Sequence, residues 1–323
     1  NLDIVFPVGD GLTLNFAMTA TSGTATHYNS YWVGRYFSTE TSIAVLEMAP
    51  SVSYAITDEI AVGFGFLAQY CDVLMRQKLN TTDALAAYGM RLNDSRLKME
   101  GDGWAFGFTA GIMYKPTDST TVGLGYRSAM QHNVKAKAHV THIPDALAAL
   151  RGLPGNSYND HARISMDQPQ SLTLGIQQKV TDKLTLMADI AWTDWSTLKH
   201  MPVKFRRGHL TGKYVANRME WPDSWRFSVG GSYRLDERWT ALASFTWDDS
   251  PINRAHADYL VPADTREIYA VGLSWEDGPW ALDGMYFIEK INDCSFGGRP
   301  AEGVFEGKYT GGFSHAFAFS ASY

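Results

Sequence analysis

Large and small residues alternate along much of this chain. In the segment GWAFGFTAGIMY (103–114), aromatic and branched residues occupy every second position, with glycine, alanine and threonine between them. Successive side chains of a strand point to opposite faces, so this pattern predicts a strand with one large apolar face and one small face. The pattern recurs in TVGLGYR (121–127), LTLMADIAW (184–192), WRFSVGGSY (225–233) and EIYAVGLSW (267–275).

The small face indicates the kind of sheet. A soluble sandwich would carry Lys, Glu and Gln on its second face, whereas glycine and serine suit the crowded inside of a closed barrel. Aromatic residues gather near the strand ends, as expected for membrane girdles. No apolar run reaches the roughly 18 residues that a transmembrane helix needs. We therefore expect an all-β fold, a transmembrane antiparallel β-barrel whose closure leaves no unpaired backbone in lipid.

The connections between the predicted strands alternate in length. Short turns such as VTDK (180–183) and EDGP (276–279) alternate with long loops such as 80–102 and 138–160. This alternation is typical of barrels with short periplasmic turns and long outer loops. It predicts thirteen visible strands, at 1–8, 11–22, 42–56, 59–79, 103–115, 119–141, 160–180, 182–206, 211–235, 237–249, 264–276, 279–294 and 307–323.

An odd strand count is unusual, because bacterial single-chain barrels have even numbers. The short turn at 8–11 also makes the first visible strand descend from the outside. We therefore expect fourteen strands in one barrel spanning 1–323, with one strand lying before residue 1.

Composition narrows the function. The chain of 323 residues has a formal net charge of −6 and no basic stripe, which argues against nucleic acid as a partner. Cys71 and Cys294 lie on distant strands, and no disulfide is expected. The sequence lacks the GxSxG, HExxH and phosphate-loop motifs, so we expect no enzyme activity and no cofactor. His132, His139 and His142 lack the spacing of a metal site, and no metal is expected either.

Eight segments in the same order resemble the FadL/TodX family of outer-membrane transporters of long-chain fatty acids and other hydrophobic compounds. They are NLDIVFPVGDGLTL (1–14), WVGRYFSTETS (32–42), PSVSYAI (50–56), GWAFGFTAGIMYKPTDSTTVGLGYRS (103–128), WTDWS (192–196), WPDSWRFSVGGSY (221–233), WDDSP (247–251) and VPADTREIYAVGLSW (261–275). The resemblance covers essentially the whole chain. It implies a fourteen-stranded barrel in the bacterial outer membrane, plugged by an N-terminal hatch. In this family the hatch and the first strand precede the point where this sequence begins.

The two longest outer loops each contain DALAA, at 83–87 and 145–149. Cap residues before each repeat and apolar residues at helical spacing predict short helices there. These helices either pack on the barrel rim or form an outward groove that captures substrate. The resemblance implies a low-affinity site between these loops. The groove residues would be Leu85, Tyr88, Met90, Leu92, Leu147, Leu150 and Leu153.

A fatty-acid carboxylate entering a low-dielectric lumen needs a cationic partner. The candidates near the outer rim are Arg76, Lys78, Arg127 and Arg218. The alternative is that basic residues form internal salt bridges, within the set Arg127, Asp189, Arg226, Asp283 and Glu47.

The segment MTATSGTATHY (18–28) breaks its alternation at Ser22 and Gly23. Glycine in a strand often marks a bulge or bend, although an ordinary strand end fits equally well. The resemblance implies a kinked strand here that opens the wall sideways into lipid.

The chain ends in FSHAFAFSASY (313–323), where the large residues alternate with serine and alanine. We expect Phe317, Phe319 and Tyr323 to face lipid. The resemblance implies that outer-membrane assembly machinery reads this end.

The leading interpretation is a monomeric, passive channel for hydrophobic small molecules, surrounded by lipid or detergent. Its substrates would be long-chain fatty acids or aromatic hydrocarbons, and they would leave sideways or into the periplasm. A general water-filled porin is the first alternative, and a barrel lipase or protease is the second.

Overall fold

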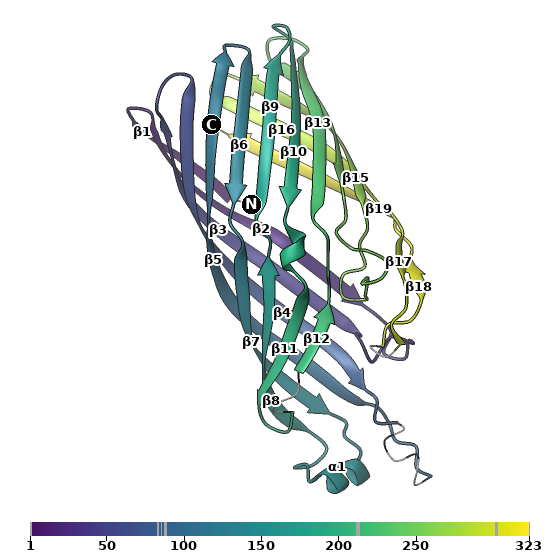
Figure 1. Cartoon of the computed structure of the whole chain (residues 1–323). Coiled ribbons are helices and arrows are strands. Elements are labelled where there is room, and N and C mark those ends of the chain that lie inside the picture. Colours follow the sequence, from purple (N-terminus) through teal and green to yellow (C-terminus); the bar gives the residue numbers. More distant parts are fainter. Residues whose placement is uncertain are drawn as a thin grey trace.

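The computed structural model describes residues 2–82, 84, 86, 89–210, 214–300 and 303–322. Its main element is an antiparallel sheet of 17 strands, curved into a tall wall (Figure 1). Within these ranges, no helix is long and apolar enough to cross a membrane.

Nine of the predicted strands each correspond to one segment of this sheet, but the strand predicted at 307–323 begins only at Phe313, because Gly307–Tyr309 (β18) pairs with Cys294–Phe296 (β17) in a separate sheet. The nine segments are β1 (Leu2–Gly9), β2 (Leu12–His27), β3 (Glu40–Ala55), β4 (Ile60–Leu79), β5 (Ser95–Thr117), β14 (Trp239–Asp248), β15 (Arg266–Asp277), β16 (Trp280–Ile291) and β19 (Phe313–Ser322). Four others are each divided in two: β6 (Thr120–Arg127) with β7 (Met130–Thr141), β8 (Tyr158–Gln168) with β9 (Ser171–Lys179), β10 (Leu184–Thr193) with β11 (His200–Arg207), and β12 (Tyr214–Arg218) with β13 (Ser224–Arg234). The 17 segments thus correspond to the thirteen predicted strands, and the predicted all-β class is confirmed.

The four divisions lie in neighbouring strands and form one line across the wall. On one side of this line β6 pairs with β9, β9 with β10, and β10 with β13. On the other side β7 pairs with β8, β8 with β11, and β11 with β12. Pro169 lies between β8 and β9, where it cannot donate a ladder hydrogen bond. The short helix Trp195–Thr197 separates β10 from β11.

Several strands run further outward than the sequence predicted. β5 begins at Ser95 instead of 103, and β2 continues to His27 instead of ending at 22. The predicted loop 80–102 is therefore too long, because SRLKMEGD (95–102) is the outer part of β5. Beyond the lipid, the outside of a strand faces water, so charged residues are the normal outward residues there. Helix α1 (Asp145–Arg151) lies at this far end, opposite the short turns (Figure 1).

Strand β5 shows how the outward face changes along its length. Trp104, Phe106 and Phe108 point outward and are exposed, as membrane-facing residues must be. Further out, the same face carries Glu100 and three other charged residues, while Leu97 and Met99 on the opposite face are buried. The membrane therefore ends near Trp104, and the outer part of the wall stands in water.

Aromatic residues bound the lipid-facing band on both sides. Trp104 and Tyr114 are ten residues apart on the outward face of β5, and Trp225 and Tyr233 are eight apart on β13. At about 3.4 Å per residue and a tilt of about 40°, these separations span about 20–26 Å. That height matches the apolar band of about 25 Å found in outer-membrane barrels.

Inside the membrane band the wall is lined by small residues, as the alternation predicted. Gly63, Gly111 and Gly125 are direct cross-strand partners on β4, β5 and β6. A Cβ atom at Gly125 would meet nothing within 4 Å. At these three positions the inner surface of the band is therefore bare backbone.

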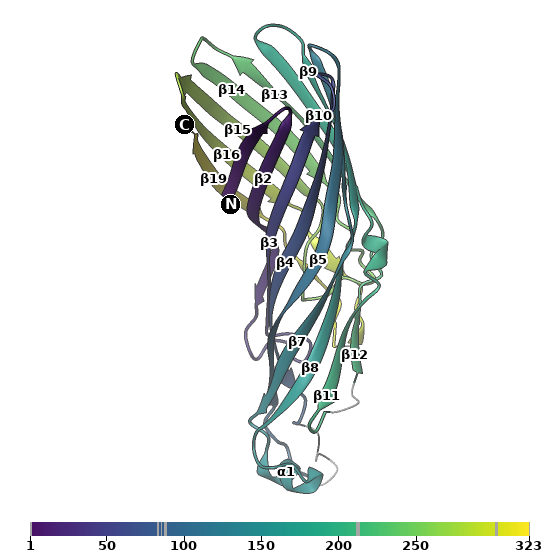
Figure 2. The same ribbon diagram turned by 90° about the vertical axis from the view of Figure 1, so that its left-hand side faces the viewer.

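The wall has two free edges. Among the described residues β1 pairs only with β2, and β19 pairs only with β16, so the barrel is not closed. Figure 2 shows both chain ends on the same side of the molecule, next to these edges. The additional strand and the hatch expected before residue 1 stay predictions.

The C-terminal strand β19 has the two faces that its sequence predicted. Phe317 and Phe319 are 70% and 83% exposed on one face. On the other face, the Ser320 hydroxyl donates to Asp283 Oδ2 at 2.7 Å. Tyr323 lies outside the described residues, and the assembly role of this end is untested.

The change in the outward face gives a test of the membrane boundary. Phe108→Arg places a charge on the lipid side near the middle of the band between Trp104 and Tyr114 and should cost about 2–4 kcal/mol, because arginine near the midplane of the bilayer is poorly solvated. Glu100→Arg, on the same face of the same strand, should leave stability almost unchanged. Urea unfolding in lipid vesicles and a heat-modifiability gel would measure both. Equal losses for the two variants would contradict the proposed boundary.

Candidate functional site

The inside of the outer half of the wall is apolar. Strand β7 alternates buried Val134, Ala136, Ala138 and Val140 with exposed polar residues. These side chains pack in one cluster with the inward residues of β3, β4, β5, β8 and β11, which include Val45, Val73, Leu97, Ile164 and Val203. We call this cluster the apolar interior. Beyond the membrane, the wall is thus polar on its outer face and apolar on its inner face. Within the membrane, the apolar face is instead the outer one.

Methionines make the apolar interior adaptable. Met75, Met99, Met201 and Met219 belong to the cluster, and Met166 packs against it. Methionine has an unbranched side chain with three rotatable bonds, so it fills irregular gaps and can rearrange around a guest. A packed region of this composition can open for an apolar ligand at lower cost than one built from β-branched residues.

A polar cluster separates the apolar interior from the glycine-lined band. Gln69 Nε2 donates to Glu47 Oε2 at 2.8 Å, and Gln69 Oε1 lies 2.8 Å from His132 Nε2. Arg127 pairs with both carboxylate oxygens of Glu47. Gln69 and His132 are fully buried and Glu47 is 4% exposed. Because β3 and β6 are separated by two strands, the ion pair between Arg127 and Glu47 ties distant parts of the wall together.

A β-bulge in strand β2 lies at the level of the polar cluster. Ala20 pairs with Leu46 and Ser22 pairs with Val45, so Thr21 is an extra residue. Gln69 Nε2 reaches Thr21 Oγ1 at 3.4 Å, and Gln168 Nε2 donates to Ser22 Oγ at 3.2 Å. The predicted break in alternation is therefore a bulge, placed one residue before Ser22 and Gly23. The strand continues beyond it, so it is not a strand end.

Charged residues alternate in sign across the opposite part of the inner wall. Arg226 lies 3.7 Å from Asp189, and Arg266 contacts Asp248 at 2.5 Å and Glu289 at 3.3 Å. These five residues lie on the adjacent strands β10, β13, β14, β15 and β16. Arg127 and Arg226 thus form the internal salt bridges that were the alternative to ligand binding.

Aromatic residues from three outer loops form a second cluster beside the apolar interior. Tyr28 stacks on Trp32 with ring centroids 4.3 Å apart, and Tyr259 meets Trp32 edge-on at 4.6 Å. Phe296 and Phe37 also contact Tyr259. Phe37 packs against both clusters. The loops at 28–39, 249–265 and 292–312 are therefore joined next to the apolar interior.

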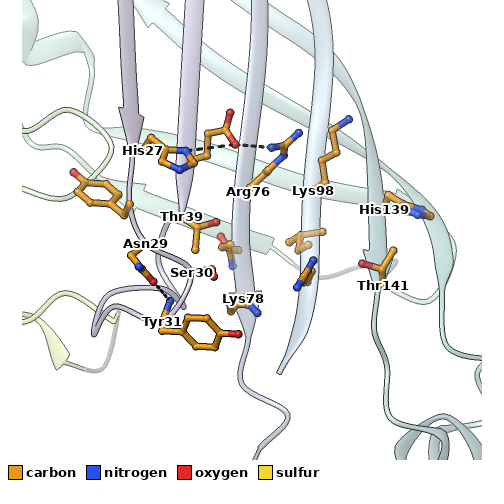
Figure 3. A pocket seen from close by; sticks show the side chains of 15 residues that line it. His27, Asn29, Ser30, Tyr31, Thr39, Arg76, Lys78, Lys98, His139 and Thr141 are labelled. Carbon is orange, nitrogen blue, oxygen red and sulfur yellow. Dashed lines mark hydrogen bonds and ion pairs between the residues drawn. The ribbon is translucent and has the colours of Figure 1, made fainter. Parts of the chain in front are cut away.

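The structure places the predicted cationic residues in different positions. Arg127 alone lies inside the wall. Arg76 lies on the outside, 2.6 Å from Glu40, because even-numbered residues of β4 face outward (Figure 3). Arg218 is exposed and contacts Glu220. Lys78 also lies at the outer end of β4, with its ammonium 5.8 Å from the Tyr31 ring centroid.

A cavity of about 780 Å³ lies between the two outer loops that contain DALAA. Its lining includes the apolar residues Leu92, Ile143 and Pro144. It also includes the cationic residues Lys78, Arg91 and Arg96. Burial lowers the pKa of Lys78, and the neighbouring Arg96 lowers it further. The Asp94 carboxylate, which also lines this cavity, offsets part of the repulsion among these cations.

The predicted groove residues are only partly brought together. The helix at 145–151 was predicted correctly, with Pro144 before it and Gly152 after it in the left-handed conformation at φ 62°. Leu147 is buried and Leu153 packs on the apolar interior, but Leu150 is 63% exposed. In the other loop Met90 is exposed and Leu92 is half-buried. Leu85 and Tyr88 lie outside the described residues.

Sequence reasoning missed the apolar interior and, within the polar cluster, the roles of Gln69 and His132. A signal for the first was present in NVKAKAHV (133–140), where small apolar residues alternate with polar and charged ones. Alternation alone does not show which face of a strand points outward, so the sequence does not distinguish this reversal from a lipid-facing apolar face. For Gln69 and His132, the signal was a polar residue at an inward position between apolar ones.

Comparisons with known proteins agree with this geometry. A family described as "outer membrane protein transport protein (OMPP1/FadL/TodX)" matches residues 1–281. A putative outer membrane protein of Neisseria meningitidis is 28% identical over 65% of this chain and 47% of its own length. A long-chain fatty acid transport protein of Escherichia coli is 24% identical over 85% of this chain and 65% of its own length. The chain thus spans about half to two thirds of the length of these relatives.

Solved structures show the same fold. A FadL homologue from Pseudomonas aeruginosa superposes with a TM-score of 0.84, at 24% identity, over 99% of this chain and 77% of its own. The toluene transporter TbuX of Ralstonia pickettii superposes with a TM-score of 0.67, at 16% identity, over 99% of this chain and 78% of its own.

The ion pair in the polar cluster predicts an asymmetric mutational response. Arg127→Met leaves the Glu47 carboxylate buried without its cation and should lower the free energy of unfolding by about 3–5 kcal/mol. Replacing both residues, with Glu47→Leu, should restore most of that loss. Arg238→Met removes an exposed ion pair with Asp277 and should cost about 0–1 kcal/mol. Urea unfolding followed by tryptophan fluorescence would compare the variants; similar losses for Arg127→Met and Arg238→Met would refute the structural role of the cluster.

Proposed function

The chain belongs to the OMPP1/FadL/TodX family of outer-membrane transport proteins, and we propose that it is a passive channel that admits hydrophobic small molecules. The observation that carries this proposal is the reversed polarity of the outer half. A wall standing in water has buried Val45, Val73, Leu97, Val134 and Ile164 on its inner side. Such an interior offers an apolar molecule a continuous favourable environment outside the membrane.

The inner surface argues against a general porin. A water-filled pore needs an interior that solvates ions and sugars, with charged groups available to the passing solute. Here the inward residues of the outer half are apolar, and the inward cations Arg127, Arg226 and Arg266 are paired with carboxylates. Membership in a transport family also makes the enzyme alternative unnecessary.

Substrate capture is proposed to begin in the cavity between the two outer loops. Leu92, Ile143 and Pro144 would contact an apolar chain, and Lys78 and Arg96 would pair with a carboxylate. This combination supports an amphiphile such as a long-chain fatty acid, which is what the Escherichia coli relative is named for. The toluene transporter shares the fold, so an aromatic hydrocarbon is the second candidate.

The exposed groove residues have a smaller proposed role. Leu150 on helix α1 and Met90 in the facing loop would provide the first apolar contact with substrate. Leu147 and Leu153 would hold α1 on the wall. Leu85 and Tyr88 keep their predicted groove role.

Exit is proposed to be sideways at the bulge. An apolar molecule descending the interior meets the buried Glu47, Gln69 and His132, whose bonds it cannot replace. At this level the extra residue Thr21 interrupts the pairing of β2 with β3. Release into the periplasm is the alternative, and the small inner face below would then accommodate the expected hatch.

Narrowing the apolar interior should block transport. Ala136 points inward and is 3% exposed, so Ala136→Phe fills the passage; His139→Phe, facing outward on the same strand, is the matched control. We expect uptake of radiolabelled oleate to fall at least tenfold in the first variant and to stay normal in the second. Uptake would be measured in cells that lack their own fatty-acid transporter, relative to the amount of folded barrel.

Two outcomes would contradict this proposal. Normal oleate uptake by well-folded Ala136→Phe protein would exclude the apolar interior as the passage. Rapid swelling of liposomes in sugar solutions would instead favour a general porin.

Removing the bulge should distinguish the exit routes. Deleting Thr21 keeps the pairs of Ala20 with Leu46 and Ser22 with Val45 and makes the ladder continuous. If exit is lateral, uptake should fall while binding of oleate to the purified protein persists. A Thr21→Ser variant keeps the extra residue and should transport normally. Unchanged uptake after the deletion would favour release into the periplasm.

A further inference from the structure

A group of cations lies on the outside of the wall, just beyond the membrane. Lys135 and Lys137 on β7 and Arg163 on β8 point away from the apolar interior, whose residues Val134, Ala136, Ala162 and Ile164 alternate with them. Lys204 and Arg206 extend the group on β11. We call these five residues the cationic rows. They stand out because the whole chain has a formal net charge of −6.

The cations are direct neighbours across the strands. Arg163 is the register partner of Lys135 on one side and of Lys204 on the other. Lys137 is the partner of His161. Like charges directly opposite one another destabilise a sheet. Repulsion among these cations therefore destabilises this part of the sheet, and a bound anion would reduce it.

Acidic residues of the protein neutralise the rows only in part, on the β5 side, where Lys98 and, more weakly, Lys137 attract the Glu100 carboxylate. On β5, Glu100 is the register partner of Lys137, but its carboxylate is bonded to Lys98 at 2.5 Å. Asp102 is the partner of Lys135 at the edge of the group. Within the described ranges, neither Lys135, Lys137 nor Arg163 forms a salt bridge. A shallow depression of about 290 Å³ lies among Lys135, Lys137, His161, Arg163 and Arg206.

The position relative to the membrane identifies the partner. Trp104 marks the outer aromatic girdle, and Asp102, two residues further out on the same face, pairs with Lys135. Two residues of a strand span about 7 Å, so the first row of cations lies at the level where lipid headgroups carry their charge. A soluble polyanion would have no reason to prefer this level.

We propose that the cationic rows bind the phosphate groups of the phosphorylated glycolipid in the outer leaflet. The Arg163 guanidinium can hold two phosphate oxygens in a bidentate contact, and Lys135 and Lys137 supply point charges on either side of the bound phosphate. The acyl chains of the same lipid would lie along the apolar face that includes Trp104 and Phe106. This inference concerns the outer face of the wall and does not depend on the transported substrate.

The test compares diphosphorylated lipid A with its dephosphorylated form on purified full-length protein by native mass spectrometry. The wild-type protein should retain the diphosphorylated lipid at least tenfold better. Lys135→Gln/Lys137→Gln/Arg163→Gln should lose that preference. Lys183→Gln/Arg234→Gln/Arg238→Gln removes three exposed cations at the short-turn end and should keep it.

Three results would overturn the inference. One is equal retention of both lipids by the wild-type protein, a comparison that needs no variant and holds even if the triple variant misfolds. Another is full retention of the diphosphorylated lipid by a folded triple variant. The last is displacement of bound lipid A by heparin or single-stranded DNA at physiological salt, which would assign the rows to a soluble polyanion.

Discussion

Backbone hydrogen bonding in lipid is the constraint on which this structure depends. Lipid offers no partner for an N–H or C=O group, so each strand in the band must pair with its neighbours along its whole membrane-spanning length. Continuous pairing fixes which residues share a face, and β4 and β5 keep the same outward positions from Phe64 to Arg76 and from Tyr114 to Arg96. Only the chemistry at those positions changes. The same alternation of inward and outward side chains therefore continues from the lipid into the water beyond it.

The change from lipid to water determines which residue types occupy the two faces of the outer half. Where lipid ends, the outward positions become charged and the inward positions become apolar, because the wall must now be soluble outside and packed inside. The methionines of this region make its packing adaptable. The apolar region ends at the level of the bulge in β2, where Gln69, Glu47 and His132 form the polar cluster. An apolar region with a polar floor and a weakened wall beside it supports a path that turns sideways.

The outside of the same strands has a separate role in the membrane. The cations opposite one another on β7, β8 and β11 are unfavourable for the isolated sheet and favourable beside a layer of phosphates. One strand, β7, thus contributes Val134 and Ala136 to the proposed passage and Lys135 and Lys137 to the proposed lipid contact. Both properties follow from the alternation of side chains along a strand.

The sequence by itself determined the all-β class, the strand order, and the outward position of Phe317 and Phe319, because alternation is a local property of each strand. It also contained the outward position of Arg76, which has the same parity as Phe64 and Phe66. The tertiary structure alone decided the contacts that cross the interior. Arg127 meets Glu47 across 80 residues, and Gln168 meets Ser22 across 146. Such contacts depend on the curvature of the whole wall, which no single strand encodes. The outer limits of β2 and β5 were also decided only by the tertiary structure. A charged strand in water and a charged loop have similar compositions, and only pairing with a neighbouring strand distinguishes one from the other.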